Sequence, residues 1–389
     1  MAEVVLATAL QKQTWSTQVT REYVRESGFL PYMGTDETSI IRIRNELKNE
    51  AGDTINFPLV QRVKGRGVRG SEVLKGNETD LGLANTSVTV DWIRQGVKVP
   101  KSTSFRTAID IWALVRPGLR SWSAELLRDD VILAFGSVVV PGTVDAQGLP
   151  GTDSTVIFSL ATAGQKNTFL TNNADRILFG NLKSNSSSLV WATSLANVDL
   201  AGDRSTAAHV RLLKSMAKTA GQTSLAGSTV TGFNTNIRPY RSDMTAGREW
   251  FVYFVGSREF RDLSQDATII SINKDARARE GNGMEKNPLF QDGDLMYQGV
   301  LIREVPEIDN YILTGAGAAG VDVAFGFFCG QSAIAVAYGM VPKIVEDLLE
   351  DYEFRPGMAI EELRGTKKTS FAGTQYGIVT SLVAAPADA

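Results

Sequence analysis

Apolar residues repeat along the chain with two different periods, and these separate expected helices from expected strands. Between Phe105 and Phe135 they recur about every 3.6 positions, which predicts one long helix spanning roughly 45 Å. Pro117 predicts a bend in this helix, and the apolar stripe continues past it without a shift. Ser102–Ser104 offer N-cap side chains and Gly136 can end the helix, so a single bent helix is expected.

A period of two residues indicates strands earlier in the chain. Thr54–Val63 is rich in β-forming residues, and Pro58 within it favours an edge strand. Thr86–Val99 alternates between two faces, one of which carries Val88, Val90 and Trp92. The stretch between these strands is long, polar and interrupted by glycines. We therefore predict a hairpin arm at Thr54–Lys98, with a reach of at most ~70 Å if fully extended.

The remaining pattern mixes helices and strands without regular alternation, which favours an α+β fold. Helices are expected at Ser205–Ala220, Ser257–Arg279 and Lys343–Tyr352, the last with an acidic face. Strands are expected at Glu249–Val255, Val300–Glu304, Val321–Phe328 and Gln375–Val383. Residues 1–50 contain little that could form a core, so they are expected to be an arm that gains order by lying on something else.

Composition excludes several classes of protein. A length of 389 residues allows two or three domains, and the net charge of −3 does not indicate a protein that mainly grips nucleic acid. Cys329 and His209 are the only cysteine and histidine, so neither an intramolecular disulfide nor a Cys/His zinc site can form. The single cysteine suits a reducing cytosol, and no apolar stretch is long enough to predict a membrane span.

Two segments match the glycine pattern of dinucleotide-binding loops, G-x-G-x-x-G. Gly65–Gly70 follows a strand, but Ser71–Ala84 lacks the apolar stripe of the helix whose N-terminus would bind a pyrophosphate. Gly315–Gly320 precedes an alternating, strand-like segment and is expected to be a loop. An oxidoreductase that binds a nucleotide cofactor through a glycine-rich loop remains an alternative, whereas the expectation is that no cofactor is bound.

Candidate catalytic residues are few, and each has a structural interpretation. Cys329 lies in an apolar strand pattern, where an inert buried thiol is expected. His209 shares a helical face with apolar residues and is expected to be structural. Asp292 and Asp294 flank a glycine and indicate a turn rather than a cation site. We therefore assign no catalytic residue and no metal ligand.

Two patches of opposite charge are candidates for contacts between copies of the chain. In the hairpin, one acid, Glu72, stands among Arg62, Lys64, Arg66, Arg69 and Lys75. The acidic patch contains Glu346, Asp347, Glu350, Asp351 and Glu353. No aromatic residue lies within Gly65–Asp91 to stack on bases, so nucleic-acid binding remains only an alternative. A solvated face is the favoured explanation of the acidic patch, and pairing of the basic arm with the acidic surface of another copy is the sharper hypothesis.

Several segments, taken in their order along the chain, resemble one group of major capsid proteins of tailed bacteriophages. The first segments are Gly52–Pro58, Gly67–Gly70, Leu74–Glu78 and Val90–Gly96. The later segments are Arg248–Gly256, Arg261–Leu263, Asn287–Phe290 and Tyr297–Glu304. The likeness covers most of the chain, from about residue 35 to the end, and its specificity lies in the order of the segments.

The resemblance implies the capsid fold shared by tailed phages and herpesviruses. That fold has an N-terminal arm, an extended hairpin called the E-loop, a peripheral domain with a long spine helix, and an axial domain. The ranges expected here are an arm at 1–50, the E-loop at 51–100, the peripheral domain at 101–244 with its spine helix at 105–135, the axial domain at 245–345, and a return to the peripheral domain at 346–389.

The resemblance also implies a function without catalysis, namely self-assembly into the icosahedral shell that encloses phage double-stranded DNA. The implied partners are other copies of the chain as hexamers and pentamers, together with scaffolding, portal and decoration proteins. Packaged DNA would be touched only non-specifically, and no membrane would be involved. The expected location is the virion capsid, assembled in the cytoplasm of the host bacterium. The nearly balanced charge suits a container, because a strongly basic lining would hold DNA by counterion release.

Overall fold

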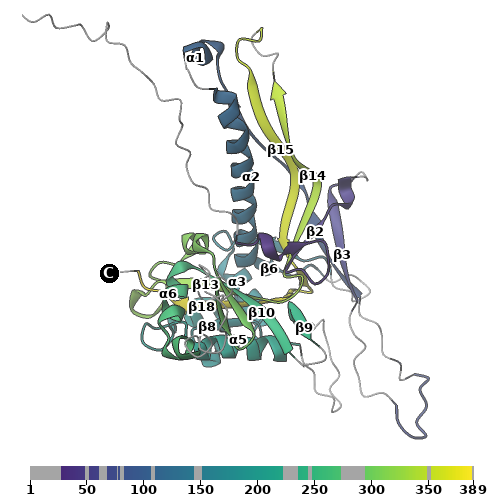
Figure 1. Cartoon of the computed structure of the whole chain (residues 1–389). Helices are drawn as coiled ribbons and strands as arrows, with labels where there is room; N and C mark the ends of the chain where they lie inside the picture. The colour runs from purple at the N-terminus through teal and green to yellow at the C-terminus, as the bar shows by residue number, and fades with distance from the viewer. Residues whose placement is uncertain are drawn as a thin grey trace, which may run out of the picture.

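The computed structural model of the chain has two visible parts, a body and an extension (Figure 1). The body is built on a seven-stranded sheet. In the extension, the long helix α2 (Ile111–Gly136) runs beside strands β14 (Ile334–Asp347) and β15 (Gly357–Lys368). This mixture confirms the α+β class. The residues that the structure describes are 28–48, 52–60, 68–76, 78, 83–106, 110–143, 151–221, 235–243, 248–272, 294–347 and 352–387.

The body sheet has the order β11-β12-β10-β13-β18-β8, and β9 pairs with β10. Its strands are β8 (Ile177–Phe179), β9 (Arg241–Asp243), β10 (Arg248–Val255), β11 (Asp294–Tyr297), β12 (Val300–Glu304), β13 (Val323–Cys329) and β18 (Ile378–Ala384). β10 is parallel to β12 and antiparallel to β13, which is antiparallel to β18. Every residue of β13 and β18 is buried, as expected for strands that are covered on both faces.

Helices cover both faces of this sheet. The end of α2 packs on one face together with α3 (Ala163–Asn172) and α4 (Trp191–Ala196), in a cluster that includes Phe135. Helices α5 (Ala207–Thr219) and α6 (Ser257–Gln265) contribute to a second apolar cluster. Strand β10 supplies alternate residues to the two clusters, which is the geometry of a sheet between two layers of helices.

Helix α2 begins later than its apolar stripe predicts. The Asp110 side chain caps it by accepting hydrogen bonds from two backbone N–H groups of the first turn, at 3.1 and 3.3 Å. The N-caps predicted at Ser102–Ser104 are therefore wrong. Phe105, the first residue of the stripe, lies on the separate short helix α1 (Lys101–Arg106) and is 93% exposed. The helix does continue through Pro117, so the prediction that this proline does not divide it is confirmed.

A second sheet forms most of the extension, with the order β1-β2-β14-β15-β5. Its other strands are β1 (Met33–Gly34), β2 (Ile41–Arg44) and β5 (Asp91–Lys98). β14 and β15 are antiparallel along almost their whole length, with two register shifts beside Met340. β2 is parallel to β14 and joins the sheet at the end nearer the body.

The acidic helix predicted at Lys343–Tyr352 is wrong in its described part. Residues up to Asp347 continue strand β14, where Ile344 pairs with Ile360 and Val345 with Ala359. Both are β-branched residues that favour a strand, and the distant strand β15 supplies the ladder hydrogen bonds. The short acidic segment contains no local feature that distinguishes the 3.6-residue period of a helix from the two-residue period of a strand. Residues 348–351 lie outside the described residues.

The base of the predicted hairpin is present. Strand β3 (Thr54–Val60) pairs antiparallel with β4 (Leu83–Thr89), and β3 has no second strand partner among the described residues, so Pro58 lies on an edge strand as predicted. The prediction is wrong after Val90, because β5 leaves the hairpin to pair with β15. Trp92 is consequently 56% exposed and does not share a buried face with the valines before it.

The body sheet joins ranges that the sequence assigns to different domains. β8 comes from 101–244, β10, β12 and β13 come from 245–345, and β18 comes from 346–389. The final strand lies between β13 and β8, so the sheet does not divide at residues 244 or 345. A strand whose residues are all buried, such as β18, is stable only where other elements cover both of its faces, and the body provides that cover.

Most of the shorter predictions agree with the structure. Helix α5 and strands β10 and β12 are confirmed at nearly the predicted bounds, whereas the helix predicted at Ser257–Arg279 is interrupted. Asp266 ends α6, and its side chain accepts hydrogen bonds from Thr268 and Ile269 at 2.8 and 3.2 Å, so it caps a new helical segment at 267–272. The remaining strand pairs are β6 (Val138–Val140) with β7 (Ser154–Val156), and β16 (Ser370–Phe371) with β17 (Thr374–Gln375).

Candidate inter-subunit surfaces

The described part of the basic hairpin is a fully exposed turn. Arg69, Glu72 and Lys75 are all exposed, and a Glu72 carboxylate oxygen accepts a hydrogen bond from the backbone N–H of Arg69 at 3.5 Å. Gly70 and Gly76 have φ values of +67° and +92°, a conformation that glycine adopts at no steric cost. The other basic residues, Arg62, Lys64 and Arg66, lie outside the described residues.

The acidic candidates lie at the opposite end of the molecule, near the tip of the β14–β15 pair (Figure 1). Glu346 accepts a hydrogen bond from Arg116 Nη2 of α2 at 2.6 Å, so this carboxylate is already paired within its own chain. Asp347 is the last residue of β14, and Glu350 and Asp351 lie outside the described residues. The basic and acidic sets therefore do not meet within one subunit.

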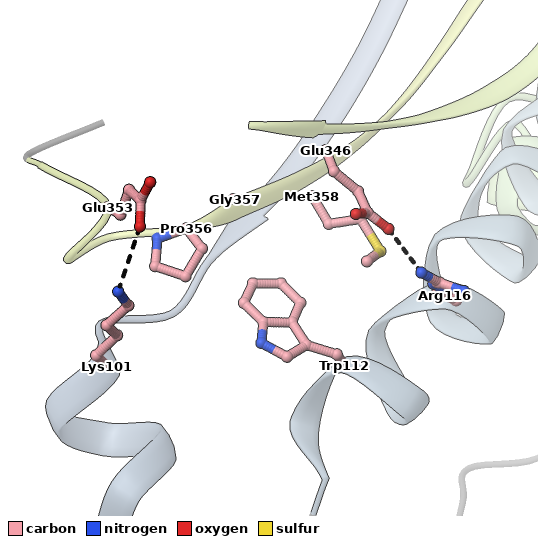
Figure 2. A pocket seen from close by; sticks show the side chains of 8 residues that line it. All are labelled: Lys101, Trp112, Arg116, Glu346, Glu353, Pro356, Gly357 and Met358. Atoms are coloured by element: carbon pink, nitrogen blue, oxygen red, sulfur yellow. Dashed lines mark hydrogen bonds and ion pairs between the residues drawn. The ribbon is translucent and has the colours of Figure 1, made fainter. Parts of the chain in front are cut away.

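Figure 2 shows a pocket of about 400 Å³ at this tip, between α1, the start of α2 and the two strands. The Trp112 ring and Met358 form its apolar part. Two ion pairs flank it, Arg116 with Glu346 and Lys101 with Glu353, the latter at 3.9 Å. All four charged side chains are between 44% and 67% exposed, so each pair adds at most about 1 kcal/mol to folding.

Large apolar side chains are exposed along the extension. Phe105 on α1 is 93% exposed, Tyr352 in the turn before β15 is 99% exposed, and Trp92 on β5 is 56% exposed. Val341 and Val345 of β14 and Phe354 are also between 36% and 45% exposed. Exposed aromatic residues gathered on one part of a molecule are typical of surfaces that other chains cover. The sequence assigned Phe105 and Trp92 to buried faces and so missed this surface.

The two candidate catalytic side chains are buried and separated. Cys329 is fully buried, burial raises the pKa of its thiol well above the ordinary value, and its Sγ donates to the Phe327 carbonyl at 3.5 Å. The His209 Nε2 lies 2.7 Å from Ser381 Oγ, and burial lowers the pKa of this imidazole to about 3. Both residues have the structural roles that the sequence predicts, and they form no catalytic pair.

The glycine loops offer no cofactor site within the described residues. Gly315–Gly320 ends in the three-residue 3-10 helix Ala318–Gly320 and is followed by β13, so no α-helix begins at the end of this loop. The first loop lies mostly outside the described residues, and the residues after Gly70 form a turn.

In the described ranges, no group of three or more His, Cys, Asp or Glu side chains is arranged to hold a metal ion. None of the helices described there is long and apolar enough to span a membrane.

A buried polar network lies under the second face of the body sheet. The Tyr253 hydroxyl of β10 donates to the Glu259 carboxylate of α6, and both side chains are fully buried. The pKa of Glu259 is raised to about 7, mainly by burial and in smaller part by the nearby Asp309 and Asp262, whereas hydrogen bonds from Tyr253 and Ser205 lower it. Gly326 of β13 leaves room for this pair, because a Cβ there would collide with the Tyr253 hydroxyl. No cation among the described residues offsets the Glu259 charge, so the folded state favours the protonated carboxyl.

We expect Glu259→Gln to become more stable relative to the wild type as the pH rises. The folded-state pKa lies above the ordinary 4.5, so the wild type loses stability between about pH 4.5 and pH 7 while a neutral amide does not. The gain should approach about 3 kcal/mol between pH 4 and pH 8. It can be measured by urea unfolding of purified subunits at each pH. The lowered pKa of His209 makes stability rise with pH, but it does so equally in both proteins and cancels in the difference between them. A stability difference that does not change with pH would contradict the expectation.

The subunit is extended and presents aromatic side chains along a projecting sheet and helix, and its described residues contain no assembled catalytic group. These features are typical of proteins that pack against other chains. Comparison with known proteins defines that class. A family model described as phage capsid protein matches residues 4–382. The major capsid protein of Pseudomonas phage KPP25 is 26% identical over 391 residues, which cover 96% of this chain and 95% of that protein.

Solved capsid structures share the fold. The capsid asymmetric unit of cyanophage Pam1 matches with a TM-score of 0.85 at 38% identity, and the capsid of Ralstonia phage GP4 matches with a TM-score of 0.70 at 23% identity. Both matches cover 100% of each chain. The chain therefore belongs to the phage capsid protein family. Its function is that of a major capsid protein, which forms the shell of the virion, and the family is one of structural proteins rather than enzymes.

Proposed function

We propose that the subunit builds an icosahedral shell from hexamers and pentamers of itself, around double-stranded DNA. The body with its seven-stranded sheet is the axial domain, which packs around the axis of each hexamer or pentamer. The extension of α2, β14, β15 and β5 is the peripheral domain, with α2 as the spine helix. This division follows the two sheets rather than the expected boundaries at residues 244 and 345.

The observation that carries this proposal is the exposed apolar surface of the extension. Burying one large aromatic side chain contributes roughly 1.5–3 kcal/mol, and a stable interface commonly buries ~1,600 Å² in total. Phe105, Tyr352 and Trp92 are exposed in a single subunit, and neighbours in a shell would cover them. Several interfaces on each subunit allow every one of them to be weak, because they act together in the closed shell.

The E-loop at 51–100 and the N-terminal arm at 1–50 would overlap neighbouring subunits in this shell. The β3–β4 base anchors the E-loop through a small apolar cluster of Ile55, Phe57, Val88 and Val90 against β14. We further propose that the basic residues of the hairpin contact acidic residues of a neighbour. The residues concerned are Arg62, Lys64, Arg66, Arg69 and Lys75 with Glu72, and on the acidic side Glu346, Asp347, Glu350 and Asp351.

The double variant Arg66→Glu, Arg69→Glu is expected to block assembly while the subunit stays folded. Arg69 is exposed in the single subunit, so its replacement affects folding little, whereas like charges at a contact cost several kcal/mol. Particle yield by sedimentation and subunit folding by circular dichroism separate these effects. The variant Arg66→Lys, Arg69→Lys keeps the charge and serves as the control. Normal particles from the reversed variant would eliminate the charge contact.

The partners proposed beyond the shell itself are a scaffolding protein during assembly, a portal protein at one vertex and, in the mature particle, decoration proteins. Contact with packaged DNA would be non-specific, which agrees with a net charge of −3. Assembly would take place in the cytoplasm of the host bacterium. The alternatives of an oxidoreductase and of a nucleic-acid-binding protein lose their support, because the chain belongs to a family of structural capsid proteins.

Electron microscopy of the expressed protein, alone and with its scaffolding protein, tests the proposal. Closed particles with five-fold and six-fold clusters of subunits are expected. Subunits that stay monomeric under both conditions, and that are also missing from particles in phage lysate, would refute it.

A further inference from the structure

A second cavity, of about 360 Å³, lies where strand β3 meets β2 and the segments that precede β14 and β18. Phe57 and Pro58 of β3 supply part of its apolar wall. Its polar lining differs from that of the pocket in Figure 2, because it consists mainly of hydrogen-bond donors. Those donors are contributed by Arg42, Arg238, Thr369 and Tyr376.

Arg42 of β2 is a shielded donor of this cavity. Its side chain is only 15% exposed, and its guanidinium lies 5.8 Å from the centre of the Phe57 ring. Its Nε is shielded from solvent and has no hydrogen-bond partner. The closest carboxylate, Glu37, lies 3.8 Å from Nη2, which is beyond hydrogen-bond length, and the Glu37 side chain is 69% exposed. A shielded guanidinium N–H without an acceptor destabilises the folded state, and a ligand that supplies an acceptor removes this cost.

Arg238 and Tyr376 face the same cavity. Arg238 is exposed, and its guanidinium forms no hydrogen bond or ion pair with the described residues. Tyr376 is buried, and within the described part of the chain its hydroxyl likewise has no hydrogen-bond partner. Burial raises the pKa of this hydroxyl, while Arg238 and Arg42 lower it, so both cations lie close to it. Two guanidinium groups and a hydroxyl thus converge on the cavity, and among its described lining residues the acidic one is Glu37, exposed at the rim.

We propose that this cavity receives the carboxylate of an acidic side chain from a second copy of the chain. Guanidinium groups bind carboxylates with two parallel hydrogen bonds, and the partly shielded position of Arg42 strengthens such a pair. A water molecule occupies about 30 Å³ of liquid, so the cavity is larger than a single ion requires and accommodates a side chain with its flanking atoms. Each copy carries 43 acidic against 40 basic residues, which leaves carboxylates to spare for such a contact.

The inference rests on the proposed shell, in which copies lie against one another, and it adds a contact at the base of the E-loop. This contact differs from the one proposed for the tip of the hairpin. It would hold the β3–β4 base, rather than the tip, against a neighbour. Because β3 is an edge strand that packs only a small apolar cluster, such a contact would fix the direction in which the E-loop leaves the subunit.

Arg238→Gln is the principal test, because Arg238 is exposed and its loss leaves no group unpaired within the subunit. At a fixed subunit concentration we expect at least about tenfold fewer particles than for the wild type, the effect of removing one partner from a shielded charge pair. Arg238→Lys, which keeps the charge without the two-pronged geometry, should fall between them. Arg211→Gln on α5 is the matched control, since Arg211 is also exposed and lies outside the cavity. Circular dichroism of each variant verifies folding.

The possible outcomes separate this contact from the shell proposal. If Arg238→Gln assembles as well as Arg211→Gln, the contact is refuted and the shell stands. If wild-type subunits form no particles, the shell proposal fails and the contact fails with it. Inorganic phosphate at constant ionic strength tests a different occupant. Stabilisation of unassembled wild-type subunits by phosphate, lost in Arg238→Gln while assembly stays normal, would show a site for small anions and overturn the contact with a second copy.

Discussion

Replacing Phe135 with alanine is expected to lower the free energy of unfolding by about 3–5 kcal/mol. Phe135 lies in the last turn of α2 and is fully buried. Its ring stacks on Phe327 of β13 at a centroid distance of 5.1 Å and also contacts Phe29 and Phe254, at 5.7 and 5.9 Å. Alanine would leave a cavity among three rings that come from distant parts of the chain. Helix α2 would thereby lose its aromatic contacts to β10 and β13 of the body sheet.

Phe105→Ala is the matched control for this change. The sequence places both phenylalanines on one apolar stripe, but Phe105 is 93% exposed, so its loss should change subunit stability by less than about 0.5 kcal/mol. Urea unfolding of purified subunits, followed by tryptophan fluorescence, measures both variants. In the proposed shell, Phe105→Ala should nevertheless reduce assembly, although the isolated subunit stays stable. Equal losses of subunit stability in the two variants would contradict the structure.

Replacing Arg364 with methionine is the second change with a large expected effect, again a loss of about 3–5 kcal/mol. Arg364 of β15 is 1% exposed and donates from Nη2 to Asp130 of α2 at 2.5 Å. The same nitrogen lies 3.4 Å from Glu362, which is also 1% exposed and accepts from Ser123 Oγ of α2 at 3.2 Å. Methionine would keep most of the volume and leave two carboxylates without their cation. This cluster links helix α2 to strand β15.

This defect should grow as the pH rises. Burial raises the pKa of Glu362 and of Asp130, and the Arg364 charge opposes that rise. Without the cation both folded-state values increase further, so the variant gains protons on folding and loses stability as the pH passes from about 4 to 8. Glu362→Gln in the same protein should recover part of the loss. Arg120→Met, at an exposed position of α2, is the control, and a loss in Arg364→Met that is the same at every pH would refute the role of the carboxylates.

The contacts between distant residues could not be predicted from the sequence. Arg116 and Glu346 form an ion pair across 230 positions, and no local pattern links them. Lys368 is a further example. It is fully buried, its ammonium donates to the Ser137 carbonyl just after α2 at 2.8 Å, and burial lowers its pKa to about 7. In the sequence it is one of two adjacent lysines, and nothing marks it as a residue that binds the end of helix α2.

The errors in the predicted elements have a common physical cause. Trp92 and the segment Lys343–Asp347 were assigned from local periodicity, but the pairing of β15 with both β14 and β5 decides their conformation and exposure. Phe105 extends a helical stripe in the sequence, yet the Asp110 cap starts α2 after it. In each case a short segment is compatible with two conformations, and tertiary contacts or a single capping side chain select one of them.

The sequence by itself determined the elements with a long or strong apolar pattern, such as the greater part of helix α2 and strands β10, β12 and β13. It also determined the order of segments that resembles the capsid family, and the hairpin base at Thr54–Val60. Only the tertiary structure decided that the final strand joins the body sheet, that the hairpin ends at Val90, and which aromatic and charged side chains face outward. Local propensity amounts to fractions of a kcal/mol per residue, whereas burial and strand pairing between distant segments involve several kcal/mol and therefore prevail.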